Sequence, residues 1–306
     1  MAPLAIVEHL DVIEERCTCL LEVLEPAIRL AVNQLQLERT PESLHGSVII
    51  AIAFAAHGSN RLRHLERFSK LSAGVLNATI GVKHSLEDLT AKFEKTSGHR
   101  VSITWGTGAG LAKRIQAGEQ ADLLVLTRQG LDTLSKDGKV AVGTERNFTS
   151  STQAVGIRKG APRPDISTPE AFKATILNAK SVAYPDPAGG GLSGVLLTQL
   201  AEKMGFAEQL KRKAKFPADN FAGKLVANGE AELAIQQKPE LMSIEGVEIL
   251  GPLPPEINVT TVFSAGVSKD AKESGPSTEL LKYLESPEAA AVFKRDGFDP
   301  PPPTSG

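Results

Sequence analysis

The sequence predicts an α/β fold, because short apolar strands alternate with amphipathic helices from residue 78 onward. Strand-like segments such as Val101–Trp105 and the end of Gly118–Leu126 are separated by segments whose apolar residues recur at helical spacing. Two glycine-rich loops, Gly106–Gly110 and Pro185–Ser193, each follow a predicted strand and precede a predicted helix. These features favour open sheets with a ligand site at the carboxyl ends of the strands.

Composition excludes several classes of protein. The chain has 306 residues, enough for two ordinary domains, and carries 34 Lys and Arg against 36 Asp and Glu, a net charge of −2. A nucleic-acid-binding protein usually has a basic excess, so we expect no nucleic-acid partner. Two cysteines, Cys17 and Cys19, exclude a disulfide scaffold and a cysteine-rich zinc module, and the six histidines lack metal-binding spacing. We therefore expect neither a metal nor a cofactor.

The first 77 residues differ in pattern from the rest. Apolar residues such as Leu4, Val7 and Leu10 recur at helical spacing, which predicts a mainly helical N-terminal extension. No basic segment precedes an apolar core at the start, so the sequence shows no convincing signal peptide. The longest apolar run, Val48–Ala56, is too short to span a bilayer. We expect this extension to be extraneous to the part that follows.

The next part predicts two strands, each followed by a helix. A strand at Ala78–Val82 precedes a helix in which Ser85 occupies the N-cap position. The strand Val101–Trp105 then leads through Gly106–Gly110 into a helix over Leu111–Ala117. This order of elements is typical of a sheet covered by helices.

The same arrangement returns later in the chain. A strand at Ser181–Tyr184 is followed by the loop Pro185–Ser193 and by a helix that ends near Gly205. Small residues let backbone N–H groups at a helix N-terminus approach a ligand, and the helix dipole favours an anion. Two such loops predict convergence on one ligand from two lobes, although a purely structural tight turn is the alternative.

The loop Gly106–Gly110 also invites interpretation as a dinucleotide-binding turn. The third glycine of that motif would fall at Leu111. The acidic residue that should close the second strand is missing, since Asp122 stands before that strand. The pattern therefore disfavours a nucleotide cofactor.

Five segments make a more specific pattern because they occur in a fixed order. They are AGEQADLLVL (117–126), YPDPAGGG (184–191), FPADNFAGKLVANGEAELAIQQ (216–237), VTTVFSAGV (259–267) and YLESPEAAAVFKRDGF (283–298). With them, residues 78–299 resemble the bacterial extracellular solute-binding proteins of ABC transporters, specifically the molybdate-binding-protein-like group. The resemblance implies a two-lobed type II periplasmic-binding-protein fold with central mixed sheets and an interlobe cleft.

The resemblance also implies how the chain is divided. Lobes that close over a ligand shield it from water and present a shape that a transporter can recognise. The last helix, Ser277–Arg295, is expected to pack on the first lobe. The implied divisions are an N-terminal extension at 1–77, a first lobe at 78–149 and 258–299, a second lobe at 150–257, and a flexible tail at 300–306.

Oxyanion-binding members of this group hold the ligand oxygens with neutral donors, which are serine hydroxyls, backbone N–H groups and a tyrosine hydroxyl. Asp186 is a further candidate for the lining of the cleft. Structural roles are the alternatives for three residues: an N-cap for Ser85, core packing for Phe221 and turn formation for Asp186. The resemblance assigns ligand binding to Ser85, Thr107, Gly108, Ala109, Ala188, Gly189, Phe221 and Gln237.

Two departures from the group bear on the ligand. The serine-rich turn has become Gly106–Gly110, in which Thr107 supplies the only hydroxyl, and Gln237 stands in place of the tyrosine. A tetrahedral oxyanion needs donors alone, whereas the amide of Gln237 is both a donor and an acceptor. A molybdate-like oxyanion and a small organic acid both remain open.

The resemblance predicts a non-enzymatic, monomeric, periplasmic solute-binding protein that delivers a small anionic or polar solute to an ABC permease. The sequence contains no nucleophile, metal or general-acid constellation that would indicate an enzyme. Two alternatives stay open. One is the ligand-sensing domain of a regulator with the same fold, and the other is an enzyme that uses Gly106–Gly110 to bind a nucleotide cofactor.

Overall fold

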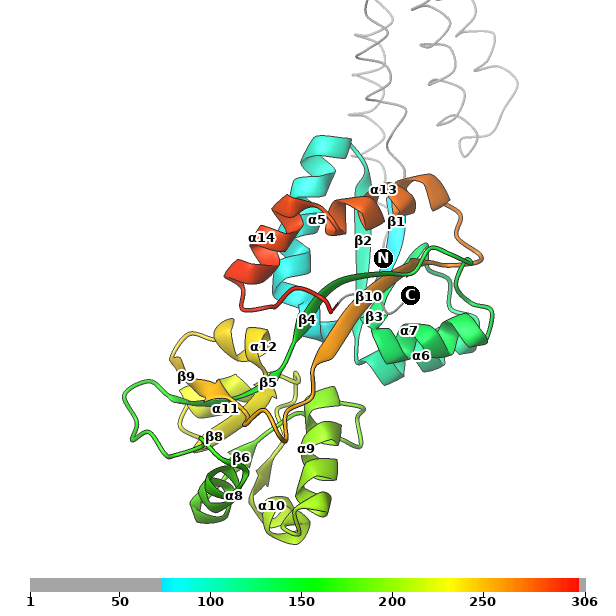
Figure 1. Cartoon of the computed structure of the whole chain (residues 1–306). Helices are drawn as coiled ribbons and strands as arrows, with labels where there is room; N and C mark the ends of the chain where they lie inside the picture. Colours follow the sequence, from blue (N-terminus) through cyan, green and yellow to red (C-terminus); the bar gives the residue numbers. More distant parts are fainter. Residues whose placement is uncertain (1–72, 303–306) are drawn as a thin grey trace, which may run out of the picture. The chain divides into compact units, whose positions relative to one another are not determined.

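The computed structural model describes residues 73–302, which form two lobes, each built on a five-stranded mixed sheet (Figure 1). The first sheet has the strand order β2-β1-β3-β10-β4, and the second has the order β7-β6-β8-β5-β9. The predicted α/β class with two mixed sheets is confirmed. The helical extension expected at 1–77 lies outside the described residues except for 73–77, and the division of the chain at 77, 149 and 257 stays a prediction.

The first lobe combines the beginning and the end of the described chain (Figure 1). Its elements are β1 (Ala73–Thr79), the 3-10 helix η2 (Ile80–Val82), α5 (Lys83–Ser97), β2 (Arg100–Gly106), α6 (Gly108–Gln116), β3 (Leu123–Thr127), α7 (Arg128–Lys136), β4 (Arg146–Ser151), β10 (Thr261–Val267), α13 (Ser274–Leu284) and α14 (Pro287–Arg295).

The second lobe is formed by the continuous segment between β4 and β10. Its elements are β5 (Gln153–Arg158), α8 (Pro169–Asn178), β6 (Val182–Ala183), α9 (Leu192–Lys203), α10 (Ala207–Lys213), β7 (Ala214–Lys215), α11 (Ala222–Ala227), β8 (Leu233–Gln237), α12 (Lys238–Met242) and β9 (Val247–Pro252).

Three local expectations are corrected. The strand expected at Ala78–Val82 is β1, which lies earlier, because its pairing with β2 runs in parallel from Ala73↔Arg100 to Thr79↔Gly106. The 3-10 helix η2 follows β1, and α5 begins directly after it at Lys83, with Val82 as its N-cap. Ser85, which was expected to be the N-cap, therefore lies inside the helix. The helix expected over Ser277–Arg295 is two helices, because Pro287 starts α14 and the Ser286 side chain caps it by accepting from the Ala289 N–H at 3.2 Å.

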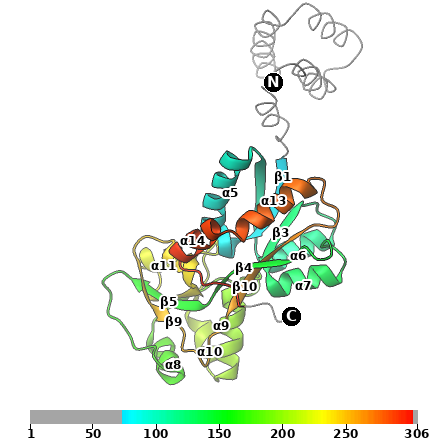
Figure 2. The same cartoon turned by 45° about the horizontal axis from the view of Figure 1, so that its top comes forward.

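Helices cover both faces of the first sheet, with α5 and α13 on one side and α6 and α7 on the other (Figure 2). Side chains of a strand point alternately to opposite faces. In β3, Leu123 and Val125 therefore pack with α5, α13 and α14, whereas Leu124 and Leu126 pack with α6 and α7. A continuous apolar strand is thus explained by burial on both faces.

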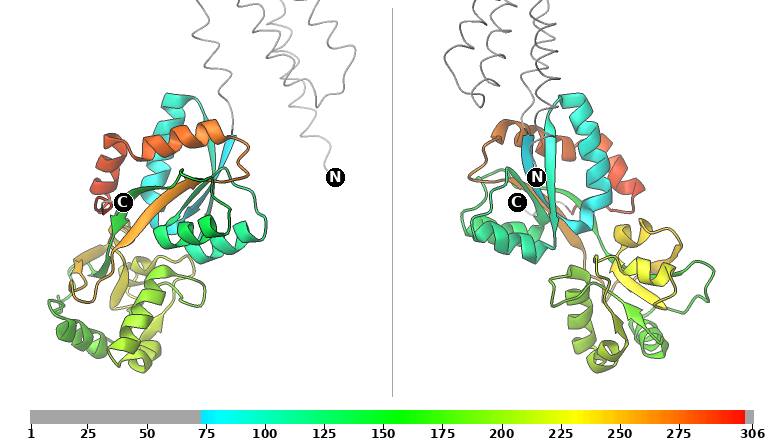
Figure 3. Two further views of the ribbon diagram at one scale, coloured as in Figure 1. Left: turned by 45° about the vertical axis from the view of Figure 1, so that its right-hand side comes forward. Right: turned by 180° about the vertical axis from the view of Figure 1, so that it is seen from behind.

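The second sheet follows the same rule. Val155 in β5 and Ile235 in β8 pack with α8, α9 and α10, whereas Ala154 and Ala234 face α11 and α12 on the other side. Figure 3 shows this lobe and the first from two further directions. Small alanine side chains on one face allow the short helices α11 and α12 to approach the sheet closely.

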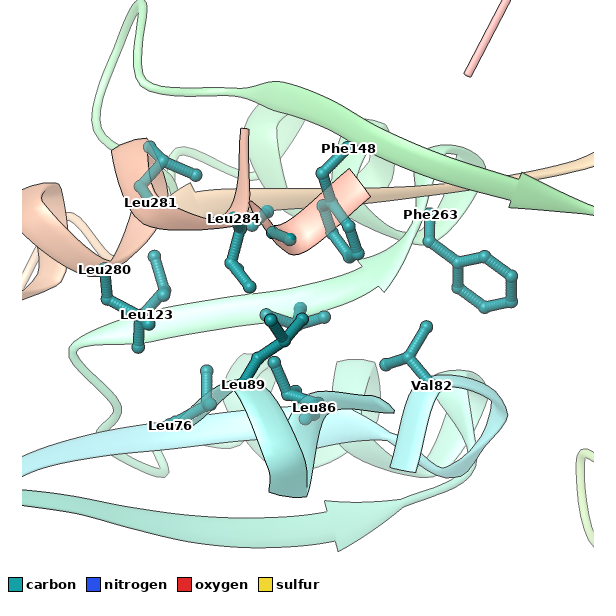
Figure 4. Packing of buried hydrophobic residues seen from close by; sticks show 14 of the residues in the cluster. Leu76, Val82, Leu86, Leu89, Leu123, Phe148, Phe263, Leu280, Leu281 and Leu284 are labelled. Carbon is teal, nitrogen blue, oxygen red and sulfur yellow. The ribbon is translucent and has the colours of Figure 1, made fainter. Parts of the chain in front are cut away.

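The larger core lies between the first sheet and the helices α5, α13 and α14 (Figure 4). Leu86 and Leu89 of α5 are fully buried there, one helical turn apart. The longest helix of residues 73–302 is α5, with 15 residues, and no helix in that range is long and apolar enough to cross a bilayer.

The chain passes between the lobes twice, from β4 to β5 and from β9 to β10. Asn258 joins the two connections: its side-chain Oδ1 accepts from the Gln153 N–H at 3.1 Å, and its Nδ2 donates to the Gln153 carbonyl at 3.0 Å. The Leu253 N–H also donates to that carbonyl, at 3.0 Å. These bonds fix where the two segments cross.

Asp122 ties the start of β1 to the turn that precedes α13. Its side chain is 6% exposed, its Oδ2 accepts from the Val75 N–H at 2.7 Å, and its Oδ1 accepts from the N–H groups of Lys272 at 2.7 Å and Glu273 at 3.1 Å. Both carboxylate oxygens therefore accept from backbone N–H groups, and the role of this residue is structural.

We predict that Asp122→Asn lowers the free energy of unfolding by about 2 kcal/mol, because the amide nitrogen would face an N–H group where a carboxylate oxygen now accepts. Urea denaturation measures the change. The matched control is Asp137→Asn, in which the exposed carboxylate accepts only from Gln116 Nε2 at 2.6 Å. Its expected change is below about 0.5 kcal/mol, and equal effects of the two substitutions would contradict the prediction.

Candidate ligand-binding cleft

A narrow cleft lies between the lobes at the carboxyl ends of β1, β2 and β8, with a cavity volume of about 40 Å³. A cavity that holds one water needs about 10–15 Å³ on this measure, so the space is that of a few water-sized groups. The lining residues are Thr79, Ile80, Gly81, Thr107, Gly108 and Phe263 of the first lobe, and Pro185, Gly190, Gly191, Leu192, Ser193, Asn220, Gln237 and Glu240 of the second.

Three of the residues assigned from the sequence line this cleft: Thr107, Gly108 and Gln237. Thr107 is the N-cap of α6, and its Oγ1 accepts from the Gly110 N–H at 3.2 Å. Thr107 Oγ1 also lies 3.3 Å from the carbonyl oxygen of Gly189 in the second lobe. The glycine loop thus brings the start of α6 against the opposite lobe.

Asp186 accepts two hydrogen bonds within the second glycine-rich loop, Pro185–Ser193. Asp186 Oδ1 accepts from the Ala188 N–H at 2.9 Å, and the Asp186 carbonyl accepts from the Gly191 N–H at 3.0 Å. Asp186, Ala188 and Gly189 are not among the cleft-lining residues, and Ala109 contacts the loop without lining the cleft. The neighbouring residues Gly190 and Gly191 line it instead.

Gln237 is 1% exposed and lies at the base of the cleft. Its Nε2 donates to Thr261 Oγ1 at 3.1 Å, and its backbone N–H donates to Ser193 Oγ at 3.2 Å. The side-chain Oε1 has no hydrogen-bond partner among the described residues. A buried acceptor without a partner is costly, so this atom favours a ligand that brings a donor.

Ser85 does not lie in the cleft. It is fully buried in α5, and its Oγ donates to Asp296 Oδ2 at 2.7 Å. Burial alone would raise the pKa of Asp296, but hydrogen bonds from Arg295 and Ser85 hold it below its usual value. The serine therefore fastens α5 to the end of α14.

Phe221 is likewise outside the lining and serves as the N-cap residue of α11. Its N–H donates to Asp219 Oδ1 at 3.1 Å, and its ring lies 5.3 Å from the Lys224 ammonium. Asn220 lines the cleft instead, with a φ of 66°, and its carbonyl accepts from Gln236 Nε2 at 2.6 Å. Because this left-handed conformation is uncommon outside glycine, it marks a constrained position beside the cleft.

Glu240 is the residue that sequence reasoning missed and that matters most for chemistry. It lies in the first turn of α12, is partly buried, and has the only ionisable side chain among the described residues that line the cleft. Burial raises its pKa to about 8, and hydrogen bonds from the Gln236 side chain and the Gln237 backbone offset part of that effect. A carboxyl in this state is mostly protonated at pH 7 and can donate a hydrogen bond.

Three of the cleft residues that the sequence analysis missed lie at or just after the end of a strand, which could have identified them. Ligands of open α/β sheets bind at the carboxyl ends of strands. Thr79 ends β1, Gly81 follows it, and Glu240 follows β8 within one helical turn. Phe263 in β10 gave no such signal, because only the tertiary structure brings it over Gly81, whose added Cβ would lie 3.1 Å from the Phe263 ring.

The cleft offers neutral donors rather than positive charge. No Lys, Arg or His occurs among the described residues that line it, and the chain from 73 to 302 has no group of three or more His, Cys, Asp or Glu side chains arranged to hold a metal ion. The available groups are backbone N–H groups at the start of α9, the Gln237 amide and the Glu240 carboxyl. Such a set can hold a small polar acid by directed hydrogen bonds.

Residues 75–299 match the family model of the bacterial extracellular solute-binding proteins, and the chain belongs to this family. The resemblance inferred from five segments is thereby confirmed. An aconitate isomerase from Pseudomonas sp is 32% identical to this chain over 228 residues, which cover 72% of this chain and 86% of that protein.

Molybdate-binding proteins are also similar to this chain. The molybdate-binding protein ModA of Escherichia coli K12 is 24% identical over 225 residues, which cover 72% of this chain and 86% of that protein. The solved structure of the Azotobacter vinelandii periplasmic molybdate-binding protein superposes with a TM-score of 0.63 at 19% identity, and the match covers 76% of this chain and 100% of that one. This structural likeness confirms the type II periplasmic-binding-protein fold.

We predict that Glu240 makes stability depend on pH between about 5 and 8. Its folded-state pKa of about 8 lies above the ordinary value of 4.5, so in that window the folded protein retains a proton that the unfolded chain has lost. The stabilisation that Glu240 contributes to the folded state is therefore fully present below pH 4.5 and is lost as the pH rises through about 8. Urea denaturation should show the wild-type free energy of unfolding falling, relative to Glu240→Gln, by up to about 1 kcal/mol per pH unit.

The matched control for this prediction is Glu256→Gln, which removes an exposed carboxyl. Its pH profile should stay parallel to that of the wild type. A Glu240→Gln profile that is also parallel to the wild type would contradict a raised pKa at Glu240.

Proposed function

We propose that this protein captures a small carboxylic acid in the cleft between its lobes and delivers it to an ABC permease. The observation that carries the proposal is the pair formed by Glu240 and Gln237, which line the same cleft at the end of β8. Family membership supports transport as the purpose of binding. The proposal includes a monomer that acts in the periplasm, as the family resemblance implies.

The hydrogen-bonding character of the pair favours an organic acid over a tetrahedral oxyanion. A protonated Glu240 donates to a ligand carboxylate, whereas the unpartnered Oε1 of Gln237 calls for a ligand donor. A fully deprotonated oxyanion has no donor to offer. A carboxylic acid that also carries a hydroxyl group has both an acceptor and a donor.

The absence of a cation from the described lining is consistent with this ligand class. Charge can be balanced by the α9 N-terminus, where Gly191, Leu192 and Ser193 line the cleft and no side chain caps the helix. Two hydrogen bonds from the second sheet hold Ser193 in place: its Oγ accepts from the Gln237 N–H of β8, and its carbonyl accepts from Gln153 Nε2 of β5 at 2.9 Å. The binding groups are thereby preorganised.

We predict that calorimetric titration of the full chain at pH 7 detects binding of at least one member of a panel containing cis- and trans-aconitate, citrate, malate and succinate, and that molybdate and sulfate bind more weakly. Glu240→Gln, which keeps a donor, should change affinity by less than about tenfold, whereas Glu240→Ala should weaken binding by more than about tenfold. The control Glu256→Ala should bind as the wild type does. Tight molybdate binding with no acid bound would overturn the proposal.

An isomerase is a second candidate function, favoured by one observation. Glu240 lines the cleft and has a pKa of about 8, so both of its protonation states are populated near neutral pH. Such a carboxyl can take a proton from a carbon next to a ligand carboxyl and return it to another carbon as the double bond moves. The 32% identity to an aconitate isomerase supports testing this activity.

We predict for this candidate that proton NMR in deuterated buffer shows interconversion of cis- and trans-aconitate by the wild-type protein. Glu240→Gln should lower the rate by at least about a hundredfold while retaining affinity, because the amide hydrogen-bonds but does not exchange a proton. If aconitate binds but its two isomers are not interconverted, the isomerase candidate is wrong and the proposed transport function remains.

A further inference from the structure

The two lobes touch directly beside the cleft. The contact is made by Thr107 and Ala109 of the first lobe and by Gly189 and Gly190 of the second. A Cβ added at Gly190 would lie 3.1 Å from Ala109 Cβ and 3.2 Å from Thr107 Oγ1. The loops meet this closely because residue 190 has no side chain.

The single proton of the Thr107 hydroxyl is used in this contact. Its oxygen accepts from the Gly110 N–H at 3.2 Å, and its single proton points to the Gly189 carbonyl at 3.3 Å. A hydroxyl has one proton to donate. While the lobes are together, Thr107 therefore has no proton left for a ligand, although it lines the cleft.

We infer that Thr107 is a positioning residue that holds the two lobes together over the ligand, rather than a residue that binds it. The inference takes the cleft to be the ligand site of the proposed function. It does not depend on which acid, if any, is bound. The capping bond to Gly110 keeps the hydroxyl oriented toward the opposite lobe.

The lobes also meet at a second place. The 3-10 helix η2 packs against α12, and a Cβ added at Gly297, which has a φ of 92°, would collide with the Met242 sulfur of α12. Glycine therefore allows a close interlobe approach here as well. Since this contact persists without Thr107, losing the hydroxyl should shift the balance between closed and open lobes without abolishing closure.

The contact between Thr107 and Gly189 lies at the edge of the cleft, because Thr107 and Gly190 both line it. When the lobes part to admit or release a ligand, this contact separates. Each release then breaks the bond between Thr107 and Gly189. Its loss should appear in the dissociation rate, with an increase of about two- to fivefold for one exposed hydrogen bond.

The chain provides matched controls. Thr107→Val removes the hydroxyl but also the helix cap, so it is paired with Thr127→Val. Thr127 caps α7 by accepting from the Gly130 N–H at the same 3.2 Å, and among residues 73–302 its side chain makes no hydrogen bond to the other lobe. Gly190→Ala, at a φ of 78°, is paired with Gly205→Ala, at a φ of 73°, where an added Cβ has nothing within 4 Å. Thr107→Ser restores the hydroxyl.

Fluorescence energy transfer between dyes on the two lobes reads the lobe separation directly. Dyes are placed on the full chain at Lys136→Cys in α7 and Lys203→Cys in α9, with Cys17 and Cys19 changed to Ser. Without ligand, Thr107→Val and Gly190→Ala should lengthen the separation, whereas Thr107→Ser, Thr127→Val and Gly205→Ala should match the parent protein. Stopped-flow release of the bound acid should show the two- to fivefold increase for Thr107→Val alone among the threonine variants.

The outcomes separate this inference from the proposed function. Equal separations in Thr107→Val and Thr127→Val would overturn the role of Thr107, whatever the ligand. If no acid binds to the parent protein, the proposed function fails, but the separations measured without ligand still decide the role of Thr107. Circular dichroism of each variant identifies a loss of folding, and the Thr107→Ser comparison then carries the test.

Discussion

The hydrogen bonds between Gln153 and Asn258 hold together the two segments by which the chain crosses from one sheet to the other. Most other features of the cleft depend on this junction. Gln153 also reaches the start of α9 through its side chain, which donates to the Ser193 carbonyl at 2.9 Å. One buried residue thus relates the crossing segments to the second-lobe wall of the cleft.

Several residues of the cleft have features that lower the stability of the ligand-free protein. A carboxyl with a raised pKa at Glu240, an unpartnered amide oxygen at Gln237 and a left-handed Asn220 are each unfavourable in the isolated fold. All three lie on the second-lobe side of one small cavity. Such a concentration of unfavourable features is expected at a functional site, where a ligand supplies the missing interactions.

The elements with strong local patterns were predictable. The glycine-rich segments were correctly placed at the starts of α6 and α9, but the loops were drawn too long, because Gly108–Gly110 and Leu192–Ser193 belong to the helices themselves. The apolar strand β3 was also recognised, and the structure buries it on both faces. Ser85 shows the limit of such reasoning, since a serine near a helix start has the same local pattern whether it faces a cleft or a neighbouring helix. Its partner, Asp296, is far away in the sequence and has no local signal.

The sequence by itself determined the α/β class, the family and the two glycine loops, because these depend on residue periodicity and on short segments in a fixed order. Tertiary structure alone decided which residues of those loops reach the cleft. Glu240 acquires its raised pKa only through burial, and Thr107 acquires its second partner only when Gly189 is brought across from the other lobe. The physical reason is that desolvation and long-range hydrogen bonds depend on neighbours that are distant along the chain.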